Sequence, residues 1–259
     1  MNTRALEVAT TERHLPRRWH STFPNAIASL LQTVVVALFV LTFLLQPFVI
    51  PSESMERTLL VGDFLLMNKQ VYASAGGLSR FVLPYRDVAR GDIVVFHRPQ
   101  PHPYVVKRVV GLPGDRLRIA DGRVTVNGLP LDEPYAAFEP APSSPFRDNF
   151  PAQVYTDPQV DPEWWKQMQS LTHAGELVVP EDEYFVLGDN RNHSKDSRYW
   201  GFVPRQAIVA HPLVIYFSLT RPSTTDVQQA ADDRLRHDSE LPARLTGFAR
   251  WKRIFRVVH

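Results

Sequence analysis

The chain has 259 residues, of which 44% are apolar, and its formal net charge is +2. This composition is typical of a globular protein of one or two domains, and it does not favour nucleic-acid binding, because no long stretch of Lys and Arg appears before the last few residues. The chain contains no cysteine, which excludes disulfides, thiol nucleophiles and cysteine-ligated metal sites.

The most apolar segment of the chain lies near its N-terminus. Ala26–Leu45 contains no charged residue and matches the ~20 residues that a helix needs to cross a bilayer. A buried core helix is a less favoured alternative, since such helices are seldom so long and charge-free. A cleavable signal peptide is also less favoured, because its apolar core spans only ~7–15 residues and no A-x-A site follows directly. We therefore predict a retained membrane anchor over residues 24–47.

Basic residues predict how this anchor is oriented. Arginines at positions 4, 13, 17 and 18 precede it, and the first basic residue after it is Arg57. Because Lys and Arg are retained on the cytoplasmic side, residues 1–23 are predicted to be a cytoplasmic tail. Everything after residue 47 is predicted to be extracytoplasmic, and no second spanning segment is visible.

Beyond the anchor, short runs rich in Val, Ile, Phe and Tyr alternate with turn residues, as is typical of strands. Asp121-Gly122 and Asn127-Gly128 are strong signals of hairpin turns. We therefore predict a mostly β extracytoplasmic domain, formed mainly by residues 48–120 and 181–220. The runs are residues 63–69, 92–98, 104–111, 115–128, 175–180, 183–189 and 207–219.

Leu129–Pro162 interrupts this pattern with eight prolines. Because strand alternation is lost there, we predict an inserted smaller subdomain, β or irregular, over residues 121–180.

The last predicted part, residues 221–259, is a polar linker followed by a basic amphipathic C-terminal segment. Four apolar residues of that segment fall at helical spacing among basic residues: Phe248, Trp251, Phe255 and Val258. The segment is predicted either to pack as a terminal helix on its own domain or to touch the outer leaflet of the membrane.

Several familiar catalytic motifs are absent. The sequence contains no G-x-S-x-G, S-x-x-K or H-E-x-x-H motif, and its nine histidines show no metal-ligand spacing. His237-Asp238-Ser239 contains the residue types of a catalytic triad, but adjacent residues cannot converge as a triad requires. What remains is a serine that works with a base other than histidine.

Ser54 and Lys107 are the candidates for such a pair. Ser54 lies in the stretch PSESM soon after the anchor, and the alternative is that it caps a following helix. Lys107 lies in YVVKRVV, where strand alternation places Val105 and Val109 on its face. It is therefore either an exposed edge residue or a desolvated amine, and desolvation lowers a lysine pKa enough for general-base catalysis near neutral pH. Arg108 points to the opposite face and is predicted to be a surface or ion-pairing residue.

A third polar cluster, GDNRNHSKDSRYWGFVP, covers residues 188–204. Gly188 and Asn190 suit a tight turn. Asp196 and Arg198 are close enough in sequence to brace a loop through a charge-assisted pair. Ser194 provides another small hydroxyl.

Together, PSESM (51–55), YVVKRVVGLPGD (104–115) and the 188–204 cluster resemble three motifs of the type I signal peptidases. These are membrane-anchored serine proteases that remove signal peptides from exported proteins. The motifs follow the family's order, and with the anchor they span residues from about 26 to 204. Three motifs in this order are far more specific than any one of them.

The resemblance implies roles for individual residues. Ser54 would be the nucleophile and Lys107 the general base. Ser52, with the main-chain amide of Ser54, would form the oxyanion hole, and Ser194 would orient the Lys107 amine. The site would be supported by an ion pair, Asp196 and Arg198. Shallow pockets for small residues at positions −1 and −3 of the substrate (A-x-A) would be lined by Ile50, Pro51, Met55, Leu59, Val105 and Val106.

The resemblance also implies a mostly β catalytic domain with an inserted β subdomain, in a single-pass protein of the inner or plasma membrane. Its N-terminus would be cytoplasmic and its catalytic domain would lie on the periplasmic side. Expected partners are secretory preproteins, membrane lipid and the export translocon. No metal, cofactor or nucleic acid is expected.

Two residues depart from the family pattern. Arg57 stands where the family often has proline, and Glu53 where many members have glycine, so the substrate preference is less well determined than the chemistry.

Two other functions are alternatives to this one. A self-cleaving repressor-type Ser–Lys protease is disfavoured by the anchor and by the lack of a DNA-binding helical module. A non-enzymatic anchored β protein, such as an inactive relative or an export adaptor, predicts replacement of Ser54, Lys107 or Ser194, and all three are present.

Overall fold

The computed structural model describes residues 22–39, 45–69, 72, 86–98, 104–220 and 249–258. The predicted cytoplasmic tail up to residue 21, residues 40–44 of the predicted anchor, residues 221–248 of the last part and the tripeptide His237-Asp238-Ser239 lie outside these residues. The chain divides into two compact units, residues 1–42 and residues 43–259, which are described one at a time.

In the first unit, α1 (Thr22–Phe39) is an α-helix whose described apolar side chains are exposed. The Thr33 hydroxyl donates to the Ser29 carbonyl at 2.9 Å, so this polar side chain is satisfied within the helix. Among the described residues, no helix has the combination of length and apolar character that a membrane crossing would need. The segment predicted as an anchor also ends differently, because a strand begins at Leu45.

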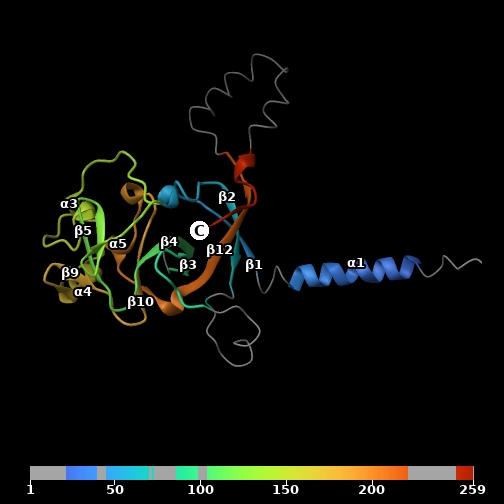
Figure 1. Ribbon diagram of the computed structural model, residues 1–259, viewed down its shortest axis with the longest axis horizontal. Helices are drawn as coiled ribbons and strands as arrows, with labels where there is room; N and C mark the ends of the chain where they lie inside the picture. Colours follow the sequence, from blue (N-terminus) through green and yellow to red (C-terminus); the bar gives the residue numbers. More distant parts are fainter. Residues whose placement is uncertain are drawn as a thin grey trace, which may run out of the picture. The chain divides into compact units, whose positions relative to one another are not determined.

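The second unit contains a large antiparallel sheet with the strand order β1-β2-β12-β3-β4-β10-β11, and β13 pairs with β12. Figure 1 labels six of these strands: β1, β2, β3, β4, β10 and β12. The predicted runs of alternating residues form most of these strands, which confirms the mostly β fold class. The strands are β1 (Leu45–Val49), β2 (Asp63–Asn68), β3 (Ile93–His97), β4 (Tyr104–Gly111), β10 (Glu183–Leu187), β11 (Val203–Pro204), β12 (Ile208–Ser218) and β13 (Arg256–Val257).

A smaller antiparallel sheet has the order β7-β6-β5-β9-β8. The Asp121-Gly122 turn has φ angles of 48° and 76°, the left-handed values that such a hairpin requires. Because this turn joins two strands of one sheet, the smaller sheet begins at Arg116 and not at the predicted boundary of residue 121. Its strands are β5 (Arg116–Ala120), β6 (Arg123–Val126), β7 (Leu129–Pro130), β8 (Thr172–His173) and β9 (Glu176–Val178).

Short helices cover the smaller sheet and join it to the larger one. They are α3 (Pro145–Asp148), α4 (Pro162–Leu171) and α5 (Ser197–Trp200). Asp161 caps α4 by accepting from the amides of Glu163 and Trp164, a start signal that the sequence analysis did not use. One apolar core unites these helices with both sheets, since Trp164 of α4, Leu117 of β5 and Phe185 of β10 all belong to it.

Near the C-terminus, the alternative of a terminal helix is wrong for the part of the basic segment that is described, whereas contact with the outer leaflet stays a prediction. Trp251–Arg253 forms a single 3₁₀ turn, η6, and β13 follows it along β12. Phe255 is 78% exposed and Val258 only 5%, so the apolar side chains do not share one face. Arg253 pairs with the buried carboxylate of Asp63 at 2.5 Å, which ties this segment to the start of β2.

Candidate active site

The loop between β1 and β2 carries the candidate nucleophile. Backbone hydrogen bonds between Ile50 and Asp63, and from Gly62 to Ile50, close its base. Glu53–Met55 forms a 3₁₀ turn, η3, and Ser54 lies inside it. The N-cap position of this turn belongs to Ser52, whose side chain makes no capping hydrogen bond. Because Ser54 lies within the turn and not at its start, the alternative that Ser54 caps a helix is wrong.

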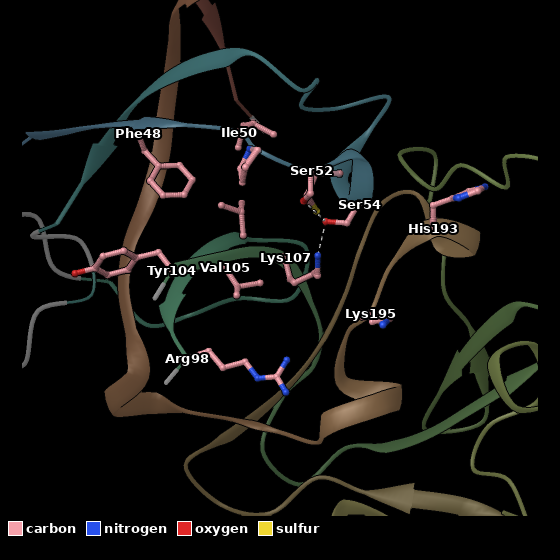
Figure 2. Close-up of a pocket in the computed structure, with 13 residues that line it drawn as sticks. Phe48, Ile50, Ser52, Ser54, Arg98, Tyr104, Val105, Lys107, His193 and Lys195 are labelled. Carbon is pink, nitrogen blue, oxygen red and sulfur yellow. Dashed lines mark hydrogen bonds between the residues drawn. The ribbon is translucent and has the colours of Figure 1, made fainter. Parts of the chain in front are cut away.

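Strand β4 brings Lys107 to this loop. Lys107 pairs with Val94 of β3 in the sheet register, and only 3% of its surface is exposed. Its Nζ is hydrogen-bonded to Ser54 Oγ, and Ser52 Oγ lies 3.4 Å from the same Ser54 oxygen (Figure 2). Three residues from two distant stretches of sequence thus converge on one hydroxyl.

Burial changes the protonation of the lysine. Desolvation lowers the pKa of Lys107 to about 8, an effect that outweighs the attraction of Asp196 and Asp189, while the charge of Arg198 lowers the pKa further. An ordinary lysine is almost wholly protonated at neutral pH. The amine of Lys107 is therefore available as a proton acceptor over a useful part of the neutral and mildly alkaline range.

The predicted ion pair is present beneath the lysine. Arg198 and Asp196 are fully buried and form a bidentate pair, and the Gly188 amide also donates to Asp196. Burial alone would raise the pKa of the Asp196 carboxyl, but Arg198 and these hydrogen bonds hold it below its usual value. Asp196 therefore stays charged near Lys107 without forming a direct ion pair with it.

Ser194 is buried beside this pair, but its predicted role is not visible as a contact. Its Oγ makes no hydrogen bond of full geometry among the described residues, although the hydroxyl lies close enough to Asp196 to help lower the pKa of that carboxyl. A methyl group on Gly188 would come within 2.3 Å of Ser194 Oγ and 2.5 Å of the Ser54 carbonyl oxygen. Glycine at position 188 is therefore required by the close approach of the two loops.

Asn190 holds the nucleophile turn in a way that the sequence analysis missed. Its main-chain amide donates to the Ser54 carbonyl at 3.1 Å, and its side-chain amide donates to the Glu53 carbonyl at 3.4 Å. The Glu53 carbonyl and the Ser54 amide belong to one peptide plane, so the second bond also orients the Ser54 N–H. The only sequence signal was the turn-forming character of Gly188 and Asn190.

Arg108, which follows Lys107, is not on the surface. Its guanidinium forms a bidentate pair with Asp189, donates to the Gly91 carbonyl, and stacks on the ring of Tyr135 at 4.0 Å. The ion-pairing alternative of the prediction is therefore confirmed, and the surface alternative is wrong. Thr58 also donates to Asp189 at 2.6 Å, which connects this pair to the loop that carries Ser54.

The two departures from the family pattern take distinct places beside the nucleophile. Arg57 has a φ of 81°, which a proline ring cannot adopt, and its guanidinium donates to the Ala136 carbonyl at 2.9 Å. Glu53 lies in η3 between Ser52 and Ser54, and its side chain is 59% exposed.

A cavity of about 390 Å³ opens over Ser54 and Lys107. Five of the six predicted pocket residues line it, whereas Leu59 is fully buried in the core beneath. Within the described ranges, no group of three or more His, Asp or Glu residues is arranged to hold a metal ion. The predicted lining residues are Ile50, Pro51, Met55, Val105 and Val106, and those that the sequence analysis missed are Phe48, Arg98, Tyr104, His193 and Lys195.

Several known proteins are similar to this chain in sequence. Residues 24–217 match the family described as signal peptidase, peptidase S26. The chain is 35% identical over 211 residues to a Synechocystis protein named probable signal peptidase I-2, covering 78% of each chain. It is 36% identical over 211 residues to the signal peptidase I of Pseudomonas fluorescens, covering 75% of this chain and 72% of that protein. A crystal structure of a signal peptidase I from Enterococcus faecalis has 32% sequence identity and covers 49% of this chain and 97% of that one, with a TM-score of 0.36, too low to establish likeness of fold.

Proposed function

The chain belongs to the signal peptidase family, peptidase S26, and on that premise we propose that Ser54 and Lys107 form its catalytic dyad. Members of this family are serine peptidases, and their substrates are preproteins that carry signal peptides. The observation that carries the proposal is the hydrogen bond between Lys107 Nζ and Ser54 Oγ in a buried position. A serine hydroxyl is a weak nucleophile unless an adjacent base removes its proton.

The reaction begins when the neutral Lys107 amine takes the proton of the Ser54 hydroxyl. Ser54 Oγ then attacks the carbonyl carbon of the residue at position −1, and the amine of the first mature residue leaves with a proton from Lys107. Water hydrolyses the resulting ester, again with Lys107 as base, and frees the signal peptide. The lowered pKa of Lys107 supports this cycle, since only the unprotonated amine can start it.

The oxyanion of this reaction would be held by the Ser54 amide and the Ser52 hydroxyl. Support comes from the 3.4 Å separation of the two serine oxygens and from Asn190, which restrains the peptide plane of the Ser54 amide. One donor to an oxyanion contributes roughly 10²–10³ in rate.

Cleavage after small residues at −1 and −3 (A-x-A) is the proposed specificity. Five predicted pocket residues line the cavity beside Ser54, and the side chains of Ile50, Met55 and Val106 are packed in the apolar core. A wall that is close-packed in this way cannot move to admit a bulky side chain without strain.

We also propose that the apolar stretch Ala26–Leu45 associates the protein with a membrane, so that its catalytic domain meets signal peptides as they emerge on the periplasmic side. The charge-free sequence and the exposed apolar side chains of α1 support this. Contact with lipid and with the export translocon belongs to the same proposal. Fractionation of cells that express the full chain tests it, and recovery in the soluble fraction would contradict it.

The dyad is tested with purified full-length protein and a preprotein that has an A-x-A site. Wild type should release the signal peptide, whereas Ser54→Ala and Lys107→Ala should not. Complementation of a conditional signal-peptidase strain by the same variants gives the cellular readout. Normal processing by Lys107→Ala in both assays would refute the assignment of the base.

A further inference from the structure

The two ends of the active-site cavity differ in chemistry. At one end Phe48, Tyr104 and Val105 line the cavity, and Arg98 lies on the same side, away from His193 (Figure 2). At the other end, His193 and Lys195 line the cavity, and Ser54 with Lys107 lies between the two ends (Figure 2). A peptide bound across Ser54 must therefore leave the apolar end and pass the polar one.

The direction of the peptide follows from the proposed function, on which this inference rests. Small residues before the cleaved bond occupy the apolar end, and the carbonyl to be attacked lies at Ser54. The first residues of the mature protein must then lie toward His193 and Lys195. Any charged group at that end meets the part of the substrate that differs from one mature protein to the next.

Glu53 supplies such a charge beside the reacting serine. Its carboxylate lies 3.7 Å from Nδ1 of His193. The other ring nitrogen, Nε2, is 3.2 Å from the Pro140 carbonyl, which can only accept, so Nε2 carries the proton. The Glu53 side chain is 59% exposed, so its carboxylate is also open to an approaching group.

Neighbouring charges define the field at this end. Burial raises the pKa of the Glu56 carboxyl, and repulsion by Glu53 and Glu139 raises it further, while His193 and Arg250 lower it. Lys195 is exposed and lines the same end of the cavity. This end of the cavity is thus lined by His193 and Lys195, and the Glu53 carboxylate lies next to His193, 3.7 Å from its ring nitrogen.

We propose that the carboxylate of Glu53, which lies beside His193, interacts electrostatically with the first two residues after the cleavage site. It favours substrates with basic residues at these positions and disfavours substrates with acidic ones. Lys195 acts in the opposite sense. Glu53, the residue between Ser52 and Ser54, then helps to determine which mature proteins are released efficiently, according to the charge at their N-termini.

The test uses full-length protein and preproteins that share one signal peptide and carry Lys, Ala or Glu at +1 and +2. In Glu53→Gln, the ratio of kcat/KM for the Lys substrate to that for the Glu substrate should fall about three- to tenfold, as loss of an exposed charge interaction with each substrate predicts. Lys195→Gln should raise the same ratio. Glu163→Gln, which removes an exposed carboxylate on α4 that pairs with Lys166, is the matched control and should leave it unchanged.

An unchanged ratio in Glu53→Gln, measured with an enzyme that cleaves the Ala substrate, would overturn the proposal. Glu53→Asp is the second variant, and it should keep the wild-type direction of preference even if its rates are lower. Loss of that direction in Glu53→Asp would likewise count against a role for the charge. Failure of the catalytic proposal is distinct, since it would appear as cleavage of all three substrates by Lys107→Ala.

Discussion

The two faces of β4 bury a basic side chain in opposite ways. Lys107 and Arg108 are adjacent, and each has only 3% of its surface exposed. Lys107 meets the Ser54 hydroxyl and, within the described residues, forms no direct ion pair. Arg108 meets the carboxylate of Asp189 in a bidentate pair and the ring of Tyr135.

This difference follows from the chemistry of the two side chains. A lysine that loses its solvent can also lose its proton, so burial without a close counter-ion yields a neutral amine. An arginine cannot be deprotonated in a protein, and its burial therefore requires a partner of opposite charge. On one face the fold produces an amine with a lowered pKa, and on the other it produces a structural connection between β4 and the loop that carries Ser54.

The largest expected effect comes from replacing Lys107 with a residue that cannot act as a neutral amine, such as an arginine like its neighbour Arg108. Lys107→Arg keeps the positive charge but cannot become neutral, and Lys107→Met keeps the bulk without the amine. Both should lower the rate of signal-peptide release by about 10²–10⁴, the usual contribution of a general base. Single-turnover cleavage of a preprotein measures this, and activity of Lys107→Arg within tenfold of wild type would contradict the neutral-base mechanism.

Replacing Arg108, on the other face of β4, should lower the stability of the fold more than it lowers the rate of cleavage. Arg108→Met leaves the buried Asp189 carboxylate without its partner, so the free energy of unfolding should fall by about 3–5 kcal/mol. Urea unfolding measures the loss. Because Arg108 does not contact the Ser54 hydroxyl in the described part of the chain, we expect the folded fraction of Arg108→Met to retain activity, and a serine-reactive acylating probe measures that fraction.

A double variant serves as the control for Arg108. Arg108→Met combined with Asp189→Leu removes both charges and should recover part of the lost stability. A double variant less stable than Arg108→Met would indicate that the stacking on Tyr135 or the bond from Thr58 to Asp189 matters more than the ion pair.

The pH dependence distinguishes the two faces further. Because the pKa of Lys107 is lowered to about 8, kcat/KM should rise about tenfold per pH unit below that value and level off above it. The folded protein also binds fewer protons than the unfolded chain between about pH 8 and 10.5, so stability due to this group should rise with pH across that window. Unfolding of wild type and Lys107→Met at pH 7.5 and 10 checks the second effect, which is on the order of 3 kcal/mol and should be absent from Lys107→Met.

Ser194 is expected to give the smallest effect on the Lys107 face. Since its hydroxyl forms no hydrogen bond of full geometry among the described residues, Ser194→Ala should lower kcat only about two- to tenfold. The steady-state rate on the A-x-A preprotein measures it, with Ser197→Ala as a comparison because the Ser197 hydroxyl accepts from the Val186 amide. A loss of 10³ in Ser194→Ala would mean that Ser194 orients the Lys107 amine during the reaction, as the family resemblance implies.

Much of the large sheet could be predicted because its signals are local. Alternating β-branched and aromatic residues located β2, β3, β4, β10 and β12, and the Asp121-Gly122 turn located the β5–β6 hairpin. β1 was not predicted, since Leu45–Val49 continues an apolar run and only its pairing with β2 distinguishes it from a helix. The helix prediction for the C-terminal segment was wrong for a related reason. The spacing of its apolar residues gives no sign that β12 has backbone groups free to pair with a further strand.

The residues of the candidate site also fall into those that local sequence could predict and those that it could not. The serine and the lysine could be named from their surroundings in sequence, because an amine between valines on a strand is expected to be desolvated. Asn190, Gly188 and His193 could not be assigned functions, since their effects depend on contacts with η3, which lies more than a hundred residues away in the sequence.

The sequence by itself identified the residues proposed for the chemistry of this protein, namely a hydroxyl, an amine and a set of apolar residues, because residue type and strand alternation are local properties. The tertiary structure alone decided that Arg108 is buried with a counter-ion, that Glu53 meets His193 at one end of the cavity, and that the C-terminal segment adds a strand. Those outcomes depend on which charges and backbone groups meet across the fold, and a pattern along one chain does not contain that information.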